Sequence, residues 1–509
     1  ISGSKELLAP RWRMLRRRKP SFTDFLSRSS AIFFGNPGAI SVQLLEGAGL
    51  TIVSAMQAFF LVFCYAILKL APPTEASLQN FISSANLLLK PFILATFLAF
   101  VFGKSVAESI IFNYLYDLVS RGEASIERAF RHGFRNLASV FVVELLVMSA
   151  AFGPILIVLL VLPIGAGDVL SGEALTYSST LLATVGIFAA VMTLVTLFVS
   201  MYAVPAAAYG YGPTRAIQVA VEVLGGNLAE SFLYALFKAF LYAIALLSIV
   251  LFGAFWGAPV LRFLLLVVFT VLIDGWTYTT KTSILAYSIE GAVPKGGERP
   301  FEIGRYLREG LSSIGSIFST KSGLASLFLA LLFFALGFAV GYDLYRTLEP
   351  LGAATESVRK AIIGDISSVP RESYLLFINI FLNNLTVLVM VVYSSVLYSF
   401  LCPLGTIMYN GIVIGFFYPI FTKVLGVEKT VAGLVPHGIP ELFAIFAGAS
   451  LAIRSSLAFL VSSLKGEDPI AVLSAEYKRA VKALFVLALI LLLAAFIEAF
   501  ITPIVMESV

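Results

Sequence analysis

The sequence predicts an all-α protein: a polytopic transmembrane helical bundle in two fused halves, with amphipathic helices at the membrane surface. Its 509 residues are 59% hydrophobic and only 13% charged, and 44 of them are Phe. A water-soluble chain of this length would expose too much apolar surface to stay monomeric. Long apolar runs, and an uneven distribution of Lys and Arg among the segments between them, indicate the same class of protein.

Apolar runs long enough to cross a bilayer recur along the chain, since a span needs roughly 20 residues. This criterion predicts about eleven spans, at 48–70, 81–103, 137–163, 178–207, 230–253, 258–285, 324–342, 374–400, 403–424, 439–462 and 483–503. The first run is far too long for the apolar region of a cleavable signal, so it is interpreted as a true span.

A stretch rich in proline and glycine around Pro294 and Pro300 separates six spans from five. The predicted organisation is a basic cytoplasmic segment (1–47), a six-span membrane domain (48–289), a cytoplasmic linker with an amphipathic helix (290–323) and a five-span membrane domain (324–509).

Basic residues predict the orientation. The N-terminal cluster contains Arg13, Arg16, Arg17, Arg18 and Lys19, and the loops at 104–136, 286–323 and 464–482 are also basic. The loops at 71–80 and 164–177 contain no Lys or Arg. Because basic loops stay inside, we expect a multi-pass cell-membrane protein with a cytoplasmic N-terminus and an extracytoplasmic C-terminus. The cluster also suits anionic lipid headgroups, whereas no segment is long enough for a soluble nucleic-acid-binding fold.

Two cytoplasmic stretches are predicted to be amphipathic helices. Their apolar stripes are Ile126, Ala129, Phe130, Gly133 and Phe134 in 123–136, and Ile303, Leu307, Leu311, Ile314 and Phe318 in 299–318. Such a stripe with a basic flank suits the headgroup region or a groove on a partner protein. The alternative is that both helices pack on the spans of the chain itself.

Several chemistries lack the residues that they need. The two cysteines, Cys64 and Cys402, lie in apolar runs, so neither a disulfide framework nor a cysteine metal site is predicted. Besides His132, the chain has only His437, and one histidine beside Glu441 falls short of the ligand count of an intramembrane metalloprotease. No G-x-S-x-G motif lies beside a usable base, and no phosphate-binding glycine loop is present. We therefore expect no catalytic residue, cofactor, metal or enzymatic activity.

The most informative segment is LVPHGIPELFAIFAGASLAIR at 434–454, where a histidine and a carboxylate stand among prolines. Polar groups that face hydrocarbon are costly unless paired. The candidate polar site is Asn383, Asn384, Asn410, His437 and Glu441. A proton switch of His437 and Glu441 is one interpretation. The other is structural, with Pro436 and Pro440 setting a helix start that His437 orients.

Other charges within the predicted spans need partners. Glu144 and Asp274 should face the bundle interior, where they could pair with Lys238. Lys90 and Lys281 lie near span ends, where lysines extend toward the interface.

Asparagines and glycines in the C-terminal spans have a packing interpretation as well. Asn383 and Asn384 can hydrogen-bond across helices, and the G-x-x-x-G spacing of Gly411 and Gly415 favours close helix contact.

Three motifs in this half carry a family resemblance. They are FINIFLNNLTV (Asn379, Asn383, Asn384), GTIMYNGIVIGFF (Gly405, Asn410, Gly411, Gly415) and LVPHGIPELFAIFAG. With these motifs the region from about 300 to 509 resembles the stage II sporulation protein M family of integral membrane proteins. In spore-formers the family member works with a membrane-anchored peptidoglycan-cleaving machine. The N-terminal half is similar to six-span membrane domains of unknown role, a relative of which precedes some glycerophosphodiester phosphodiesterases.

Together these features predict a membrane subunit or permease-like scaffold of an envelope-associated complex, without catalytic activity of its own. Its partners would be membrane lipids and proteins docked at the cytoplasmic helices, and self-association stays open. An alternative is a transporter or channel for an ion or lipid-like solute, with Asn383, Asn410, His437 and Glu441 lining its path. An intramembrane enzyme acting on lipid is a further alternative.

Overall fold

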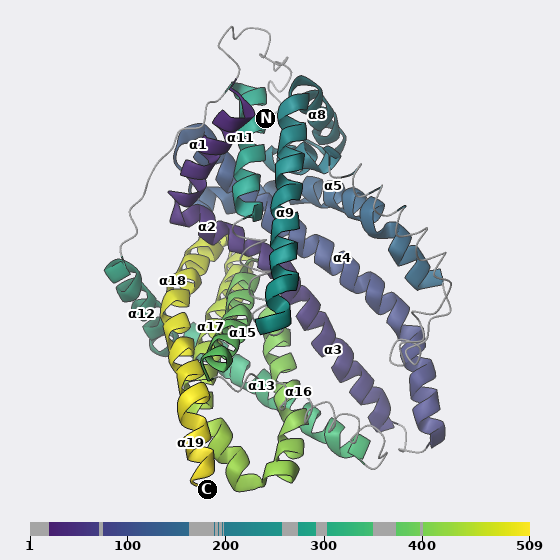
Figure 1. Cartoon of the computed structure of the whole chain (residues 1–509), viewed down its shortest axis with the longest axis vertical. Helices are drawn as coiled ribbons and strands as arrows, with labels where there is room; N and C mark the ends of the chain where they lie inside the picture. The colour runs from purple at the N-terminus through teal and green to yellow at the C-terminus, as the bar shows by residue number, and fades with distance from the viewer. Residues whose placement is uncertain are drawn as a thin grey trace.

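The computed structural model describes residues 20–70, 75–161, 198–256, 273–291, 303–349, 373–397 and 401–509, together with 188, 192 and 196. Within these ranges every regular element is helical, which confirms the all-α prediction (Figure 1). Their arrangement is that of a helical bundle, and the chain is a multi-pass membrane protein because several of its helices are long and apolar. The basic cluster from Arg13 to Lys19 lies outside the described residues.

The described elements of the N-terminal half are α1 (Phe22–Phe34), α2 (Pro37–Gln43), the 3₁₀ turn η2 (Leu44–Gly47), α3 (Ala48–Leu70), α4 (Glu75–Arg121), α5 (Ile126–Val161), an apolar helix at Phe198–Tyr209, α8 (Pro213–Gly226), α9 (Leu228–Trp256) and α11 (Trp276–Glu290). Those of the C-terminal half are α12 (Ile303–Ser319), α13 (Lys321–Leu348), α15 (Ser373–Tyr393), the 3₁₀ turn η6 (Ser394–Leu397), α16 (Leu401–Leu425), α17 (Val427–Lys465), α18 (Pro469–Phe496), the π-helical turn η7 (Ile497–Ile501) and α19 (Thr502–Glu507).

The predicted number of spans is not confirmed. Among the described residues seven helices are long and apolar enough to cross a membrane, or eight if α8 and α9, bent by 99° at their junction, form one span. The predicted run at 81–103 is part of α4, which is 47 residues long. The predicted runs at 178–207 and 258–285 fall largely outside the described residues.

Local sequence explains the sharp turn between α17 and α18. The first helix ends at Gly466, whose left-handed φ of 71° suits a residue without a side chain. Two residues later the Asp468 side chain accepts hydrogen bonds from the backbone N–H groups of Ile470 and Ala471, and Pro469 opens α18. Glycine at the end and a capping aspartate at the start form a short connection between antiparallel helices.

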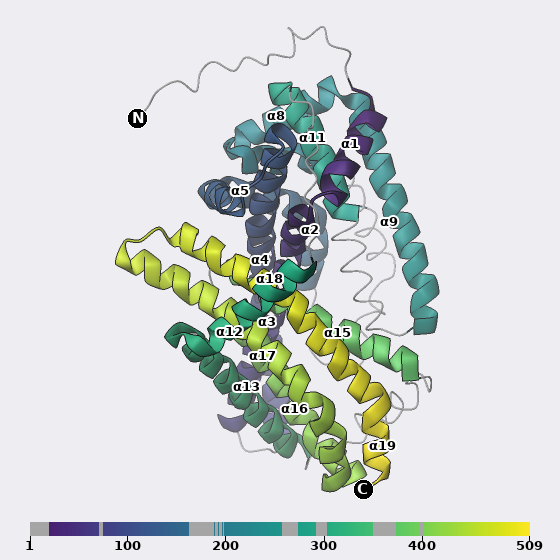
Figure 2. The ribbon, with the colours of Figure 1, turned by 90° about the vertical axis from the view of Figure 1, so that its left-hand side faces the viewer.

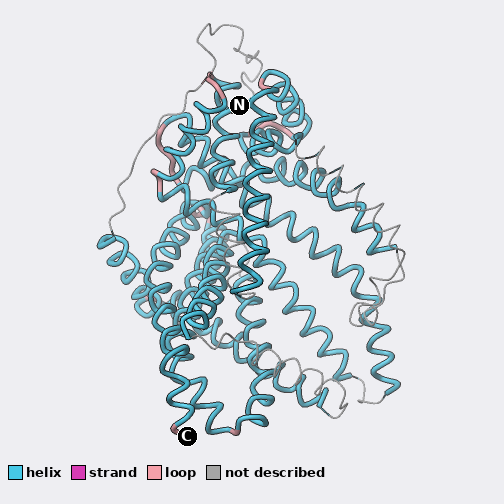
Figure 3. Tube along the Cα trace, viewed as in Figure 1, coloured by secondary structure: helices cyan, strands magenta, loops and turns pink. Residues whose placement is uncertain are grey.

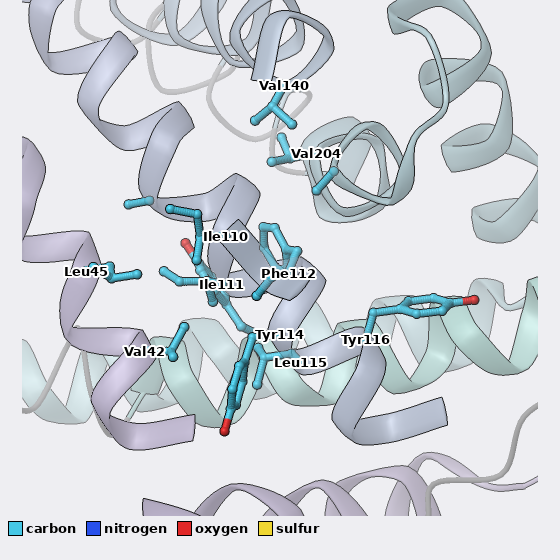
Figure 4. Close-up of a cluster of buried hydrophobic side chains, with 14 of the residues drawn as sticks. Val42, Leu45, Ile110, Ile111, Phe112, Tyr114, Leu115, Tyr116, Val140 and Val204 are labelled. Carbon is cyan, nitrogen blue, oxygen red and sulfur yellow. The ribbon is translucent and has the colours of Figure 1, made fainter. Parts of the chain in front are cut away.

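The core of the N-terminal half surrounds the second part of α4. Ile110, Ile111 and Leu115 are buried there against Val42 and Leu45 of α2 and η2 (Figure 4). The same apolar cluster reaches into α5 and into the C-terminal half, so the two halves share one packed interior.

Two glycine pairs hold α13 and α16 together. A Cβ atom at Gly411 or Gly415 would meet the backbone carbonyls of α13, and one at Gly337 or Gly341 would meet those of α16. Both helices therefore present a G-x-x-x-G face to the other, so that their backbones approach closely. The packing interpretation of Gly411 and Gly415 is confirmed.

The predicted basic loop at 464–482 contacts the other two, at 104–136 and 286–323. Arg131 of α5 lies 2.5 Å from Asp468, beside the turn of the projecting α17–α18 hairpin (Figure 2). Lys482 of α18 lies 3.0 Å from Glu309 of α12. One loop predicted to lie on the basic side of the membrane is thus in contact with both of the others.

Both predicted amphipathic stretches pack on the chain itself. From Ile126 the stretch at 123–136 forms the first turns of α5 and continues into it without a break, in a described trace of helices joined by short loops (Figure 3). Phe130 is fully buried, with its ring 5.2 Å from that of Tyr477. The other stretch forms a separate helix, α12, which buries Ile314 and Ile317 against α18 but exposes Leu311 and Phe318 of the predicted stripe.

Candidate intramembrane cation site

The proline-flanked histidine lies inside a long helix. Pro436 and Pro440 are interior to α17, which begins at Val427, so the prediction that they set a helix start is wrong. The physical reason lies at Gly426. Its positive φ of 86° ends the helical conformation between α16 and α17, so that α17 begins at Val427, ahead of both prolines. Prolines within membrane helices are tolerated because neighbouring helices and side chains satisfy the freed backbone groups.

Three titratable side chains meet at this point. His437 and Glu441 lie one turn apart on α17, and Glu498 approaches from the π-helical turn η7 at the end of α18. One ligand atom from each lies within 4.8 Å of the other two. His437 Nε2 lies 3.6 Å from Glu498 Oε2, too far for a hydrogen bond but suited to two ligands around one ion.

Further polar groups orient two of the three side chains. Thr502 Oγ1 lies 3.2 Å from His437 Nδ1. In the tautomer whose Nδ1–H donates to Thr502, the lone pair of Nε2 faces Glu498. Asn384 of α15 lies beside Glu441, and its Oδ1 accepts from Asn383 Nδ2 at 3.3 Å. These contacts resemble the outer hydrogen bonds that fix metal ligands.

The charge of the site is unbalanced. His437 is buried, with 9% of its side chain exposed, whereas the Glu498 side chain is 30% exposed. In the part of the chain that the structure describes, no Lys or Arg pairs with Glu441 or Glu498. Two carboxylates beside a neutral imidazole carry a charge of −2 when ionised, which is costly in a membrane unless a cation is bound.

The structure unites three of the five predicted polar residues. Asn384, His437 and Glu441 meet, and Asn383 contributes through Asn384, although its own side chain is exposed. Asn410 instead donates to the backbone carbonyl of Thr406 within α16, at 2.8 Å.

Glu498 and Thr502 are absent from the predicted site. A signal for them exists in the sequence of α18 and its continuation. The buried residues Leu487, Leu491 and Ala494 recur at helical spacing, and the same spacing continues to Glu498 and then Thr502. The stripe therefore directs both polar side chains toward the bundle interior.

A second cluster of charges lies in the N-terminal half. Lys238 Nζ is 2.7 Å from Asp274 Oδ1, which confirms the predicted pairing of these residues. Glu144 pairs with Lys104 of α4, at 2.9 Å, and not with Lys238. The prediction that Lys281 extends to the interface is wrong: its ammonium lies buried, 4.6 Å from the centre of the Phe112 ring. The cause is that α11 is enclosed by its neighbours, so that residues 277–286 are all buried.

Comparison with known proteins identifies the C-terminal half. No curated protein and no solved structure matches the chain. Residues 330–503, which contain all three motifs and the whole cluster of His437, Glu441 and Glu498, match the family model described as "Stage II sporulation protein M", and the predicted resemblance of this half is thereby confirmed.

Proposed function

We propose that this membrane protein is a permease-like membrane subunit that binds a divalent cation within its C-terminal bundle. The observation that carries the proposal is the convergence of His437, Glu441 and Glu498, whose ligand atoms lie within 4.8 Å of one another, without a Lys or Arg partner among the described residues. Of the functions considered from the sequence, an ion transporter or an ion-dependent membrane subunit fits this site best.

Ligand chemistry favours a divalent ion of the zinc class. Imidazole nitrogen with carboxylate oxygens is a common ligand set for Zn²⁺, and three protein ligands leave a fourth position open. A charge of +2 balances the two carboxylates. The partial exposure of Glu498 provides an entry for the ion. Because all three titratable side chains of the described site are used as ligands, no general base remains beside it, which supports binding or transport over catalysis.

The orientation belongs to the same proposal. We place the N-terminus in the cytoplasm and the C-terminus outside the cell membrane, supported by the contact of Arg131 with Asp468 and of Lys482 with Glu309. With three basic loops on the cytoplasmic side, His437 and Glu498 lie toward the opposite ends of their helices. The cation site would then be nearer the extracytoplasmic face.

Zinc binding by the purified protein tests the proposal. Chain stripped of metal with a chelator and titrated with Zn²⁺ in detergent is expected to bind one ion per chain. Glu498→Gln should weaken binding by more than the roughly 10–100-fold that loss of an outer-shell contact causes. Glu507→Gln is the matched control, since Glu507 is exposed on α19. Binding that is equal in both variants would overturn the assignment.

A measurement of zinc flux distinguishes a transporter from a membrane subunit that binds zinc without transporting it. Proteoliposomes with a zinc-sensitive dye inside are expected to show uptake that His437→Gln abolishes if the chain is a transporter. Zinc binding without uptake would favour the second candidate, a membrane subunit of a larger complex. That candidate rests on Arg131 near the start of α5. About half of its side chain, 49%, is exposed and so accessible to a partner protein.

A further inference from the structure

The phenol of Tyr278 lies between two carboxylates in the N-terminal half. Its oxygen is 2.6 Å from Oε1 of Glu46, on η2, and 2.7 Å from Oε1 of Glu108, on α4. Tyr278 is 5% exposed and Glu108 2%, so water does not separate these groups. Both distances are those of strong O–H···O hydrogen bonds.

One hydrogen cannot serve both contacts. A tyrosine hydroxyl donates once, and an ionised carboxylate only accepts. With both carboxylates ionised, one of the two short contacts would bring lone pairs together with no hydrogen between them. Both contacts are satisfied only if one carboxyl is protonated and donates to the phenol oxygen, while the phenol donates to the other.

Neighbouring groups identify the protonated partner. Lys104 Nζ lies 2.6 Å from Oε1 of Glu108, which favours the ionised form of that carboxylate. Oε2 of Glu46 accepts a hydrogen bond from the neutral side-chain amide of Gln43, whose Nε2 lies 2.7 Å away. Among the described residues no lysine or arginine forms an ion pair with Glu46. The proton therefore belongs on Oε1 of Glu46.

The balance of charges across the cluster also requires one added proton. The groups that surround this site are Glu46 of η2, Lys104 and Glu108 of α4, Glu144 of α5, Lys238 and Tyr242 of α9, Asp274 just before α11, and Tyr278 and Lys281 of α11. Four carboxyl groups thus face three lysines. One proton makes the numbers of positive and negative charges equal.

We propose that Glu46 holds a proton and can pass it to Glu108 through Tyr278, so that this cluster is a proton-binding site separate from the cation site. In the transfer, the O–H bond of Glu46 breaks as its proton binds the phenol oxygen. The phenol releases its own proton to Oε1 of Glu108. Tyr278 ends neutral, and the negative charge has moved from Glu108 to Glu46.

Infrared difference spectra of the full-length protein in detergent test this site. At neutral pH, wild type minus Glu46→Gln is expected to contain the C=O stretching band of a carboxylic acid that shifts down in D₂O. Glu507→Gln is the control, because Glu507 is exposed on α19, outside this cluster, and its replacement should leave that band unchanged. A difference spectrum that contains carboxylate bands in place of the acid band, or an acid band removed by Glu507→Gln, would overturn the proposal.

Tyr278→Phe supplies a second measurement that does not depend on replacing Glu46. The acid loses its hydrogen-bond acceptor, so its C=O band is expected to move to higher wavenumber. An unchanged band position would show that the proton does not lie on the Tyr278 contact. Zinc should be saturating in all samples, so that Glu441 and Glu498 contribute equally to each spectrum.

Discussion

Glu476→Gln is expected to destabilise the C-terminal half strongly, because it leaves the guanidinium of Arg454 buried without its anion. Arg454 Nε donates to Glu476 Oε2 at 2.9 Å, and Nη1 donates to Ser316 Oγ at 2.9 Å, so this arginine connects α17, α18 and α12. The side chains of Arg454 and Glu476 are 4% and 14% exposed. Water therefore has little access to replace the lost carboxylate.

The magnitude follows from the asymmetry of buried ion pairs. Removing one partner costs about 3–5 kcal/mol, whereas replacing both by apolar groups is often neutral. Since Glu476 keeps some contact with solvent, we expect about 3 kcal/mol. For a helical unit of 150–250 residues this lowers Tm by about 6–12 °C. The double variant Arg454→Met, Glu476→Leu should recover most of that loss.

Thermal unfolding in detergent, followed by near-ultraviolet circular dichroism, measures both effects. Glu467→Gln is the control, since Glu467 is exposed in the neighbouring turn and its replacement should change stability by no more than about 0.5 kcal/mol. If Glu476→Gln unfolds at the wild-type temperature, or if the double variant is as unstable as the single one, the reasoning about the buried charge is refuted.

Three further predictions concern other contacts. Gly415→Leu should lower Tm by a few degrees or prevent folding, because overpacking costs about 1–3 kcal/mol or more where a backbone carbonyl of α13 lies in the way; an unchanged Tm would contradict the close helix contact. Thr502→Val should weaken zinc binding about 10–100-fold by freeing the His437 ring, without changing the number of ions bound in a titration. The hydrogen bond from Arg131 lowers the pKa of Asp468, so this carboxylate contributes stability above its unfolded pKa of about 3.9 and loses it at lower pH. The Tm difference between wild type and Asp468→Asn should accordingly be constant near neutral pH and shrink below about pH 4; a difference independent of pH would refute the pairing.

Features determined by short-range sequence were predictable. Hydrophobic runs located α3, α9, α13, α15 and α16 because burial in lipid depends on the composition of about 20 consecutive residues. The G-x-x-x-G spacing of Gly411 and Gly415 predicted a close helix contact, because it too depends only on residues that are near one another in the sequence. The pairing of Lys238 with Asp274 followed from the cost of an unpaired charge in the membrane.

Features that depend on tertiary contact were not predictable in this way. Glu498 joins His437, 61 residues away along the chain, only because the end of α18 packs on α17. The helix start expected at Pro436 failed because proline signals a start only where no earlier break exists, and Gly426 provides that break. Lys281 was expected at the interface because sequence does not reveal that neighbouring helices enclose α11.

The two polar sites differ in what can balance their buried charge. In the N-terminal cluster the acids exceed the lysines by one, Glu46 accepts a hydrogen bond from Gln43 and contacts the Tyr278 phenol, and Tyr278 is 5% exposed. A proton fits there, since it needs no ligand shell. In the C-terminal site two carboxylates stand without a described basic partner, His437 offers a lone pair, and the Glu498 side chain is 30% exposed. Two missing charges, a nitrogen ligand and access from outside together favour a divalent ion over a proton. The number of uncompensated negative charges, together with the available ligands and the access to the site, therefore distinguishes a site that holds a proton from one that holds a metal.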